Sequence, residues 1–313
     1  MTRVALVTGA TGGLGRTLVP MLRAARWQVH ATGRRPRGGE DIAALDLTHA
    51  LPDGLCRGVD TVFHLAALSA PWGRRADFHA INVDAVARLA AAARVAGCRR
   101  FVHVSTPSIY AEPRDRWAIG EGDPPARRFA NDYARTKWAG EQAVRASGMA
   151  ATILRPSAIV GPDDAVLLPR LLRAVRRGRV PLPAGGRALV ELTDARDVAA
   201  ALLLAADAPP TEANLSGGAA MPVRAIVARI AARLALPVRL VALPRPLAMA
   251  AATAAEAWGH VAGREPVVTR YTATALGWSR TFDLSHARAA LGWHPRIAPE
   301  AAIDHALEHR CAA

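Results

Sequence analysis

The sequence predicts an α/β protein: a doubly wound parallel sheet followed by a smaller mixed cap. Over roughly the first 155 residues, short β-branched runs alternate with longer segments of helical spacing, which is typical of a parallel sheet with helices on both faces. Beyond Pro156 this alternation stops, and Pro, Gly and Arg become dense over residues 161–187. We therefore expect a first domain over residues 1–160 and mainly a cap over 161–313, with segments near 188–206 returning to the first domain.

The predicted strands are short runs of apolar and β-branched residues, and the predicted helices carry apolar residues three or four positions apart. In the first half, strands are expected at 4–7, 28–32, 42–47, 61–65, 101–105 and 151–154, and helices at 14–26, 83–96 and 131–146. In the second half, we expect helices at 196–206 and 223–234, a strand at 238–243, and an Ala-rich buried or lid helix at 246–258. Ligands of doubly wound sheets bind at the carboxyl ends of the strands, so we expect a site there.

Charge and composition exclude a nucleic-acid partner and single out one residue as a candidate for function. The net charge is +14, but the basic residues come as singles and pairs, without a run interleaved with aromatics. Of the 40 basic residues only Lys137 is a lysine, and the others are all arginines. Arg replaces Lys on most solvated surfaces but not where a compact ammonium is needed. Lys137 is therefore a candidate functional residue.

Cysteine usage and hydropathy favour the cytoplasm. The three cysteines lie far apart and are odd in number, which fits neither a disulfide framework nor a zinc pattern. The chain runs straight into its first predicted strand, and no stretch reaches the roughly 18 apolar residues of a membrane span. We expect a cytoplasmic protein with no bound metal.

A glycine-rich turn, residues 8–15, connects the first predicted strand to the first helix. Gly9 permits a tight turn, Gly12 lets the backbone approach a pyrophosphate, and Gly15 allows close packing of helix on strand. The helix N-terminus offers unpaired N–H groups to phosphates. Strand before and helix after make this a Rossmann fingerprint. The residues expected to bind a dinucleotide here are Gly9, Thr11, Gly12, Gly13, Leu14 and Gly15.

The end of the second predicted strand favours NADP(H) over NAD(H). A free ribose 2′-hydroxyl usually meets an Asp or Glu about 20 residues beyond the loop, but here Gly33 is followed by Arg34 and Arg35. A guanidinium suits a 2′-phosphate, so we expect Arg34 as the main contact, with Arg35 either a second contact or a solvated arginine. Asp46 and Leu47 would lie beside the adenine, unless Asp46 only closes a turn.

A second set of residues points to proton transfer. Tyr133 and Lys137 stand four positions apart on one face of the predicted helix 131–146. Tyr alone has a pKa of about 10, and a nearby ammonium favours its phenolate, so the pair suits acid–base chemistry. Ser105 and Thr106 end a neighbouring strand, where either hydroxyl can bind a substrate oxygen.

Together these motifs resemble those of the extended (atypical) short-chain dehydrogenases/reductases, in the NAD-dependent epimerase/dehydratase superfamily. The matching segments are the glycine loop, 62–67, Asn82, 104–106, 133–137 and 154–156. The resemblance implies that Thr106, rather than Ser105, is the catalytic hydroxyl beside Tyr133 and Lys137. The further cofactor contacts that it implies are Leu65, Ala66, Ala67, Asn82, Tyr133, Lys137, Pro156 and Ser157. Relatives often pair their helices, so we also expect a homodimer.

Local departures narrow the branch of the family. Pro107 and Ser108 stand where sugar-nucleotide dehydratases usually carry an acidic pair, and Val190 stands where sugar-nucleotide enzymes tend to place an Arg. Segments 105–108, 70–73 and 266–270 are more similar to 3β-hydroxysteroid dehydrogenases and 2-alkyl-3-oxoalkanoate reductases, which act on apolar ketones or alcohols. The candidate substrate-contacting residues are Ser69, Trp72, Ser108, Met249, Trp258 and Tyr271.

The leading hypothesis is an NADP(H)-dependent oxidoreductase that interconverts a ketone and a secondary alcohol on an apolar small molecule, with Tyr133 as general acid/base. Two alternatives stay open. One is an NAD-dependent sugar-nucleotide epimerase, which needs a tightly held NAD. The other is a non-catalytic NADP-binding regulator, a class that usually lacks the Tyr–Lys pair.

Overall fold

Seven parallel strands form the central sheet of the structure, a computed structural model that describes residues 2–311. The strands are β1 (Val4–Thr8), β2 (Gln28–Gly33), β3 (Ala43–Ala44), β4 (Thr61–His64), β5 (Arg100–Val104), β7 (Ala151–Pro156) and β12 (Glu212–Leu215). Their spatial order is β3-β2-β1-β4-β5-β7-β12. The chain thus builds outward from β1 in one direction and then, from β4 on, in the other. This is the predicted Rossmann-type sheet, with its switch point between β1 and β4.

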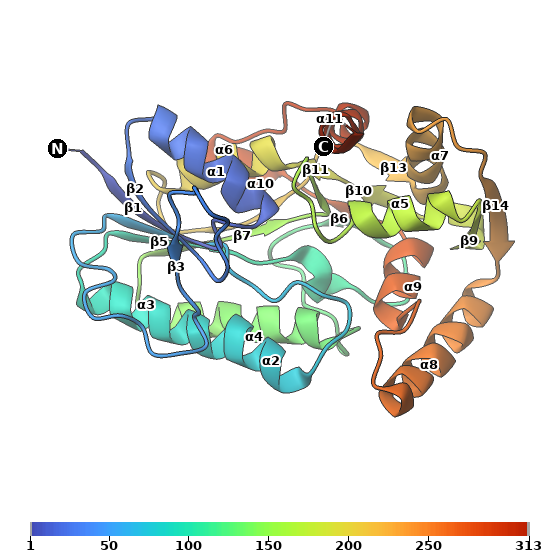
Figure 1. The fold of residues 1–313 in the computed structure, drawn as a ribbon, viewed down its shortest axis with the longest axis horizontal. Helices are drawn as coiled ribbons and strands as arrows, with labels where there is room; N and C mark the ends of the chain where they lie inside the picture. Colours follow the sequence, from blue (N-terminus) through green and yellow to red (C-terminus); the bar gives the residue numbers. More distant parts are fainter. Residues whose placement is uncertain (1, 312–313) are drawn as a thin grey trace.

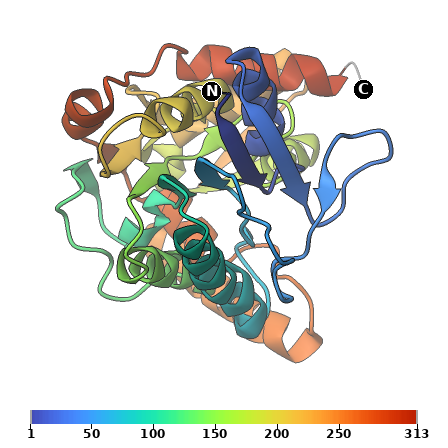
Figure 2. The same cartoon turned by 90° about the vertical axis from the view of Figure 1, so that its left-hand side faces the viewer.

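Helices cover both faces of the sheet (Figure 1). One face carries α1 (Gly13–Ala24), α6 (Ala195–Ala205) and α10 (Ser285–Leu291), and the other carries α2 (Arg75–His79), α3 (Ala85–Val95) and α4 (Asp132–Ala146). Figure 2 shows the two layers from the side, with the blue helix α1 above the sheet and the teal helix α3 below it. Each layer closes over its own apolar core, one containing Leu18 and Leu202 and the other Leu89 and Phe101.

Segments from the second half of the chain belong to the sheet domain. Helix α6 packs on α1. Strand β12 pairs with β7, and α10 packs against both α6 and β12. The Trp293 indole, just after α10, donates a 2.9 Å hydrogen bond to the Asp197 carbonyl in α6. The sequence contains no local pattern from which the placement of β12 and α10 in the sheet domain could have been predicted.

The cap lies beyond the carboxyl ends of the sheet strands (Figure 1). Its elements are α5 (Leu168–Arg176), β9 (Arg179–Pro183), β10 (Leu189–Glu191), β13 (Ala220–Pro222), α7 (Val223–Arg233), β14 (Arg239–Leu243), α8 (Arg245–Ala262), α9 (Arg270–Gly277), β15 (Arg280–Phe282) and α11 (Pro299–Cys311). A separate core that includes Leu172, Ile226 and Ile303 holds α5, α7 and α11 together. Strand β15 pairs with β6 (Arg116–Ile119), which ties the cap to the segment after β5.

Two predicted elements differ from the structure. The strand expected at 42–47 is only Ala43–Ala44, because the chain turns at Asp46. Helix α8 extends beyond the predicted 246–258 and buries only one face, leaving Trp258 72% exposed. Among residues 2–311, no helix combines the length and apolar content that a bilayer crossing requires.

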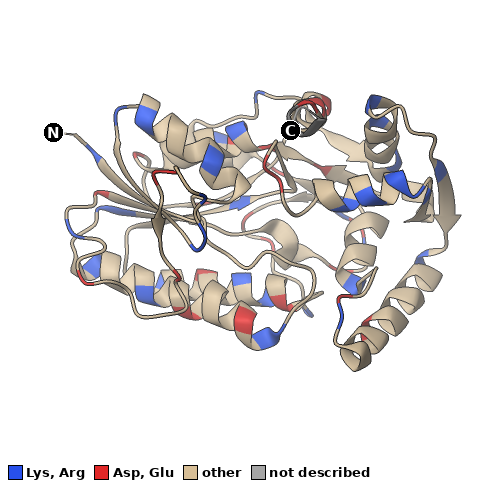
Figure 3. Cartoon of the chain, in the orientation of Figure 1, with Lys and Arg blue, Asp and Glu red and all other residues tan. Residues whose placement is uncertain are grey.

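Basic side chains are spread over the helices of both parts of the molecule (Figure 3). Many lie beside carboxylates: Arg16 is 2.6 Å from Glu40, and Arg229 is 2.6 Å from Asp304. Exposed pairs of this kind stabilise a protein little. The charge of +14 is therefore distributed over the fold rather than gathered on one element.

Candidate active site

The glycine loop between β1 and α1 lies tightly against the loop after β4. Gly9 has φ of +74°, and a Cβ added there would come within 2.7 Å of the Ala66 backbone nitrogen. A Cβ on Gly15 would lie 2.4 Å from the Gly9 carbonyl oxygen. Backbone atoms cannot move aside as a flexible side chain can, so both positions require glycine.

The start of α1 suits a phosphate ligand. The helix begins at Gly13 after Gly12, which provides no side-chain cap, so the first N–H groups point outward with the positive end of the helix dipole. Thr11 packs against Gly33, where an added Cβ would lie 2.5 Å from the Thr11 methyl. Leu14 packs on the apolar core behind the loop. A helix start beside the ends of β1, β2 and β4 fits a dinucleotide.

Arg34 and Arg35 follow β2 directly, and both are exposed. Neither side chain forms a hydrogen bond or ion pair with any other part of residues 2–311, although Arg34 interacts electrostatically with Asp46. Asp46 itself accepts two hydrogen bonds from Thr48, at 2.9 Å from the N–H and 2.7 Å from the hydroxyl. These bonds lower the pKa of the Asp46 carboxyl. Asp46 therefore closes a turn in this structure, and the buried Leu47 follows it.

Hydroxyl groups from four segments meet where β5 ends. The Thr106 hydroxyl donates to Ser108 Oγ at 3.0 Å and accepts from the Ser108 N–H at 3.1 Å. Ser108 Oγ is 2.8 Å from the Tyr271 hydroxyl on α9. Tyr133, in the first turn of α4, lies close enough to the Thr106 and Ser69 hydroxyls for both to affect the pKa of its phenol. The structure thus brings together five predicted residues, which we call the hydroxyl cluster: Ser69, Thr106, Ser108, Tyr133 and Tyr271.

Tyr133 keeps its proton at neutral pH. Burial raises the pKa of its phenol to about 12, and the neighbouring Tyr271 adds to the rise, while hydrogen bonds with Ser69 and Thr106 oppose it. The sequence led us to expect a pKa lowered by Lys137. That expectation is wrong for the protein without cofactor, because the ammonium is held elsewhere and does not contribute. A protonated phenol is a proton donor.

Lys137 lies one helical turn from Tyr133 and is 1% exposed. Its ammonium donates to the Val104 carbonyl at 2.7 Å and lies 3.3 Å from His103 Nε2. Burial lowers the pKa of Lys137 to about 8, and the Glu141 carboxylate opposes this shift. The amine therefore still carries its proton in most molecules at pH 7, at the carboxyl end of β5.

Two buried histidines lie beside this lysine. His64 on β4 and His103 on β5 are register neighbours whose rings stack with centroids 5.4 Å apart. Burial and the Lys137 charge lower the pKa of His64 to about 3 and that of His103 well below its usual value. Both rings are neutral, so His103 Nε2 is free to accept a hydrogen from Lys137. Thr8 Oγ1 lies 2.7 Å from His64 Nδ1 at the other end of the stack.

Asn82 holds the loop after β4. Its Oδ1 accepts from the Leu68 N–H at 2.9 Å, and its Nδ2 donates to the Leu68 carbonyl at 3.2 Å and to Thr136 Oγ1 at 3.1 Å. With its amide used in this way, Asn82 positions the segment that contains Leu65, Ala66, Ala67 and Ser69. The cofactor contact that the resemblance implied for Asn82 stays a prediction. Thr136 precedes Lys137, so the same amide ties the loop to α4.

Pro156 and Ser157 lie at the end of β7. The Ser157 N–H donates to the Leu215 carbonyl at 2.7 Å, and its carbonyl accepts from Thr193 Oγ1 at 2.5 Å. Its side chain donates to the Glu191 carbonyl at 2.8 Å. Ser157 thus forms hydrogen bonds with other residues of the protein. These bonds fix the position of Pro156 at the edge of the sheet where the hydroxyl cluster lies.

Two of the remaining substrate candidates pack against other side chains, and the third is exposed. Trp72 packs against His260 of α8, with ring centroids 4.4 Å apart and ring planes tilted by 48°, so it joins the loop after β4 to the cap. Met249 accepts a weak hydrogen bond from Thr274 at 3.9 Å and packs between α8 and α9. Trp258, by contrast, is exposed on α8.

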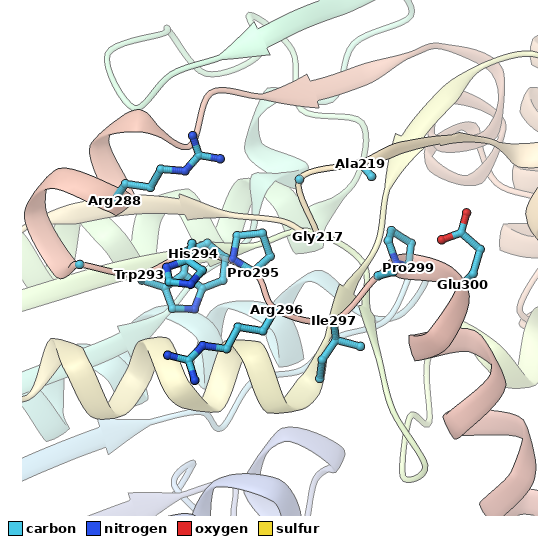
Figure 4. Close-up of a pocket in the computed structure, with 13 residues that line it drawn as sticks. Gly217, Ala219, Arg288, Trp293, His294, Pro295, Arg296, Ile297, Pro299 and Glu300 are labelled. Atoms are coloured by element: carbon cyan, nitrogen blue, oxygen red, sulfur yellow. The ribbon is translucent and has the colours of Figure 1, made fainter.

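A pocket of about 710 Å³ opens elsewhere, beside the loop between α10 and α11 (Figure 4). Arg288, His294 and Arg296 contribute side chains to its wall, and prolines and glycines supply much of the rest. None of the residues predicted for the site lines this pocket. The predicted site residues therefore lie apart from this pocket.

Comparison with known proteins identifies the family. The family model described as "NAD dependent epimerase/dehydratase family" matches residues 5–215. The chain belongs to this family. A ketoreductase of Stigmatella aurantiaca that acts on a farnesylated dihydroquinoline oxide is 32% identical over 95% of this chain and 94% of its own. A 2-alkyl-3-oxoalkanoate reductase of Shewanella oneidensis is 30% identical over 95% of this chain and 83% of its own.

A solved structure extends the likeness to the whole fold. MoeE5, in complex with UDP-glucose and NAD, has a TM-score of 0.79 and 27% identity, and the alignment covers 98% of both chains. The superfamily that the motifs indicated is thus confirmed, and the named relatives include the reductase branch. The glycine loop, Tyr133 and Thr106 all lie within the matched residues 5–215.

Proposed function

We propose that this family member is an NADP(H)-dependent oxidoreductase that interconverts a ketone and a secondary alcohol on an apolar small molecule. The observation that carries the proposal is the pair Tyr133 and Thr106, which lie close together in the hydroxyl cluster at the carboxyl edge of the sheet. Ligands of this fold bind at that edge. The buried Lys137 one turn away completes the set of groups that a ketone reductase of this family needs.

In the proposed reaction, side chains of this protein bind the carbonyl oxygen of the substrate and supply the proton. Tyr133 and Thr106 present two hydroxyls to one carbonyl oxygen, and both stabilise the negative charge that develops there. Tyr133, whose pKa lies well above neutral pH, carries its proton there and donates it to the alkoxide. Ser108 and Tyr271 extend the hydrogen-bond chain and orient the Thr106 hydroxyl. The reduced nicotinamide, when bound, supplies the hydride.

The preference for NADP(H) is part of the proposal. Arg34 and Arg35 stand exposed at the end of β2 without hydrogen-bond partners in residues 2–311. Asp46, the carboxylate nearest this strand end in the predicted site, is bonded to Thr48. The strand end thus offers guanidinium groups, which suit a 2′-phosphate.

The relatives' names support reduction of a ketone. One is named a ketoreductase and another a 2-alkyl-3-oxoalkanoate reductase, and both align over nearly the whole chain. The UDP-glucose and NAD bound to MoeE5 keep sugar-nucleotide chemistry as the competing outcome. Val190, at the aligned position where sugar-nucleotide enzymes tend to carry Arg, argues against it.

The test is NADPH oxidation by the purified protein over a panel of apolar ketones. Tyr133→Phe should lower kcat/KM about 100- to 10,000-fold, since it removes a general acid. Tyr110→Phe is the matched control, because Tyr110 is buried, accepts from Arg155 at 2.9 Å and takes no part in the hydroxyl cluster. Full activity of Tyr133→Phe contradicts the proposal. Tightly copurified NAD with turnover of a sugar nucleotide supports the epimerase, and NADPH binding without turnover of any ketone supports the regulator.

We further propose a cytoplasmic homodimer. Cys56 and Cys98 are free and buried, as expected in a reducing compartment. Helix α3 leaves Val95 82% exposed at its end, on the face of the sheet domain that also carries α4. Elution as a monomer at micromolar concentration would contradict the dimer.

A further inference from the structure

Arg280, the first residue of β15, has no counterion. Within residues 2–311 its side chain forms neither an ion pair nor a hydrogen bond, and its Nη1 is buried without a partner. Burial lowers the pKa of its guanidinium, which shows how poorly the surrounding protein solvates the charge. A buried charge is costly unless it is paired. An unpaired buried charge lowers the stability of the protein, and such destabilising residues are typical of functional positions.

The neighbouring arginine is a contrast. Arg116 on β6 is the register partner of Arg280. Its side chain is more deeply buried than that of Arg280, and its guanidinium donates to Asp123 at 3.0 Å and to the Pro124 carbonyl at 3.2 Å. Among the residues that it describes, the structure therefore provides hydrogen-bond partners for the Arg116 side chain but none for the Arg280 side chain.

Arg280 lies beside the hydroxyl cluster. Register partners on parallel strands project to the same face of a sheet, and the Arg116 guanidinium lies 5.4 Å over the ring of Tyr110, two residues beyond Ser108. Tyr271, which bonds Ser108, interacts electrostatically with both Arg280 and Tyr133. The Tyr271 phenol is therefore near both the unpaired guanidinium and the proposed proton donor.

We propose that Arg280 is a specificity-determining residue that binds an anionic group of the substrate, a carboxylate close to the reacting ketone. The assignment rests on the proposed function. A guanidinium and a carboxylate form two parallel hydrogen bonds, and such a pair at once satisfies the buried charge and fixes the orientation of the ketone.

The short distances select a carboxylate near the ketone over a remote anion. The chain from Thr106 through Ser108 to Tyr271 has links of 3.0 and 2.8 Å. A carbonyl bound at Thr106 and an anion bound beside Tyr271 are therefore separated by little more than two hydrogen bonds. A 3-oxo acid, with one carbon between ketone and carboxylate, has this compactness. A diphosphate carried on the far side of a sugar ring does not.

The experiment compares a 2-alkyl-3-oxo acid with its neutral methyl ester as substrates, with NADPH, in the wild type, Arg280→Met, Arg280→Lys and Arg116→Met. The wild type should prefer the acid. In Arg280→Met the ratio of kcat/KM for acid over ester should fall about 10- to 100-fold, as expected for loss of a hydrogen-bonded charge pair. Arg280→Lys should recover part of the ratio, and Arg116→Met should leave it unchanged. A wild type indifferent to the charge, or an Arg280→Met ratio equal to that of the wild type, overturns the proposal.

Stability separates this binding role from a structural one. Arg280→Met breaks no bond in the described structure, so its midpoint of thermal unfolding should equal or exceed that of the wild type. Arg116→Met breaks two bonds and should unfold at lower temperature. A large loss of stability in Arg280→Met would mean that the charge has a structural partner, against the proposal.

A binding measurement separates failure of this inference from failure of the proposed function. If the wild type reduces neither acid nor ester, ketone reduction is wrong, and titration calorimetry with the matching alkanoate and with uridine diphosphate still tests Arg280. Weaker alkanoate binding by Arg280→Met upholds the carboxylate site. If Arg280→Met weakens the binding of uridine diphosphate alone, the guanidinium binds a phosphate and the carboxylate proposal is overturned. The proposal is also overturned if the wild type and Arg280→Met bind each probe equally well.

Discussion

Ser105 donates a 2.5 Å hydrogen bond to Oε1 of Glu141, although the next residue, Thr106, belongs to the hydroxyl cluster. Glu141 is fully buried on α4 and also binds Arg155 of β7, at 2.9 Å from Nε and 2.6 Å from Nη2. Arg155 Nη1 in turn donates to the Tyr110 hydroxyl at 2.9 Å. Two adjacent hydroxyls thus serve different purposes: one joins helix to sheet, and the other faces the proposed chemistry.

This division predicts opposite phenotypes for two neighbouring substitutions. Thr106→Val keeps the side-chain shape and removes the hydroxyl, so kcat/KM for ketone reduction should fall about 100-fold, as when an enzyme loses one donor to a developing oxyanion. Ser105→Ala should leave kcat near that of the wild type and lower the unfolding free energy by about 1 kcal/mol. Steady-state kinetics and urea unfolding of both variants decide the matter. If Ser105→Ala is as slow as Thr106→Val, the assignment of the two hydroxyls is wrong.

The Glu141–Arg155 pair predicts a large loss of stability on conservative change. Glu141→Gln removes the charge that Arg155 faces in the interior, and breaking one side of a buried ion pair costs about 3–5 kcal/mol. Glu212, 2.6 Å from Arg155, retains part of the compensation, so we expect the lower end of that range. Asp207→Asn is the control, since its pair with Arg3 is exposed and should matter little. Equal urea midpoints for Glu141→Gln and the wild type would contradict this role.

The features that the sequence predicted correctly have local causes. The turn at Gly9 needs a positive φ, and a strand and a helix flank it in the chain itself. Tyr133 and Lys137 share a helix face because of their spacing, whatever packs around them. The helix expected at 131–146 is Asp132–Ala146, and the strand expected at 101–105 is Arg100–Val104.

The features that were missed depend on contacts between distant segments. The Lys137 ammonium on α4 turns to the Val104 carbonyl on β5. His103 has the composition of a core residue, and only the fold shows that its Nε2 faces the lysine while its Nδ1 has no partner in residues 2–311. Arg280 is one arginine among many in the sequence. Its lack of a counterion is visible only once β15 lies beside β6.

The buried Lys137 predicts a specific dependence of stability on pH. Its pKa is about 8 in the folded protein and 10.5 as a free side chain. Between these values the unfolded chain binds more protons than the folded one, so stability from this group rises with pH. Relative to Lys137→Met, the wild type should gain up to about 3 kcal/mol in unfolding free energy from pH 8 to pH 10.5. A difference between the two proteins that stays constant over this range would show that the ammonium is not desolvated in the native state.

Arg34 predicts how the protein distinguishes its two nicotinamide cofactors. Arg34→Ser removes a guanidinium without a bonded partner in residues 2–311, so the fold should be unaffected, while KM for NADPH should rise about 10-fold or more through loss of a charged hydrogen bond. KM for NADH should not change, because NADH carries no 2′-phosphate. Arg37→Ser is the matched control: Arg37 is exposed in the same loop, and its hydrogen bonds are formed by its backbone, from its N–H to the Glu40 carboxylate at 2.9 Å and from the Glu40 N–H to its carbonyl at 3.2 Å. Since the predicted contact is exposed, added salt should weaken NADPH binding by the wild type more than by Arg34→Ser. Parallel losses for both cofactors would instead mean that Arg34 supports the loop and that the choice between them lies elsewhere.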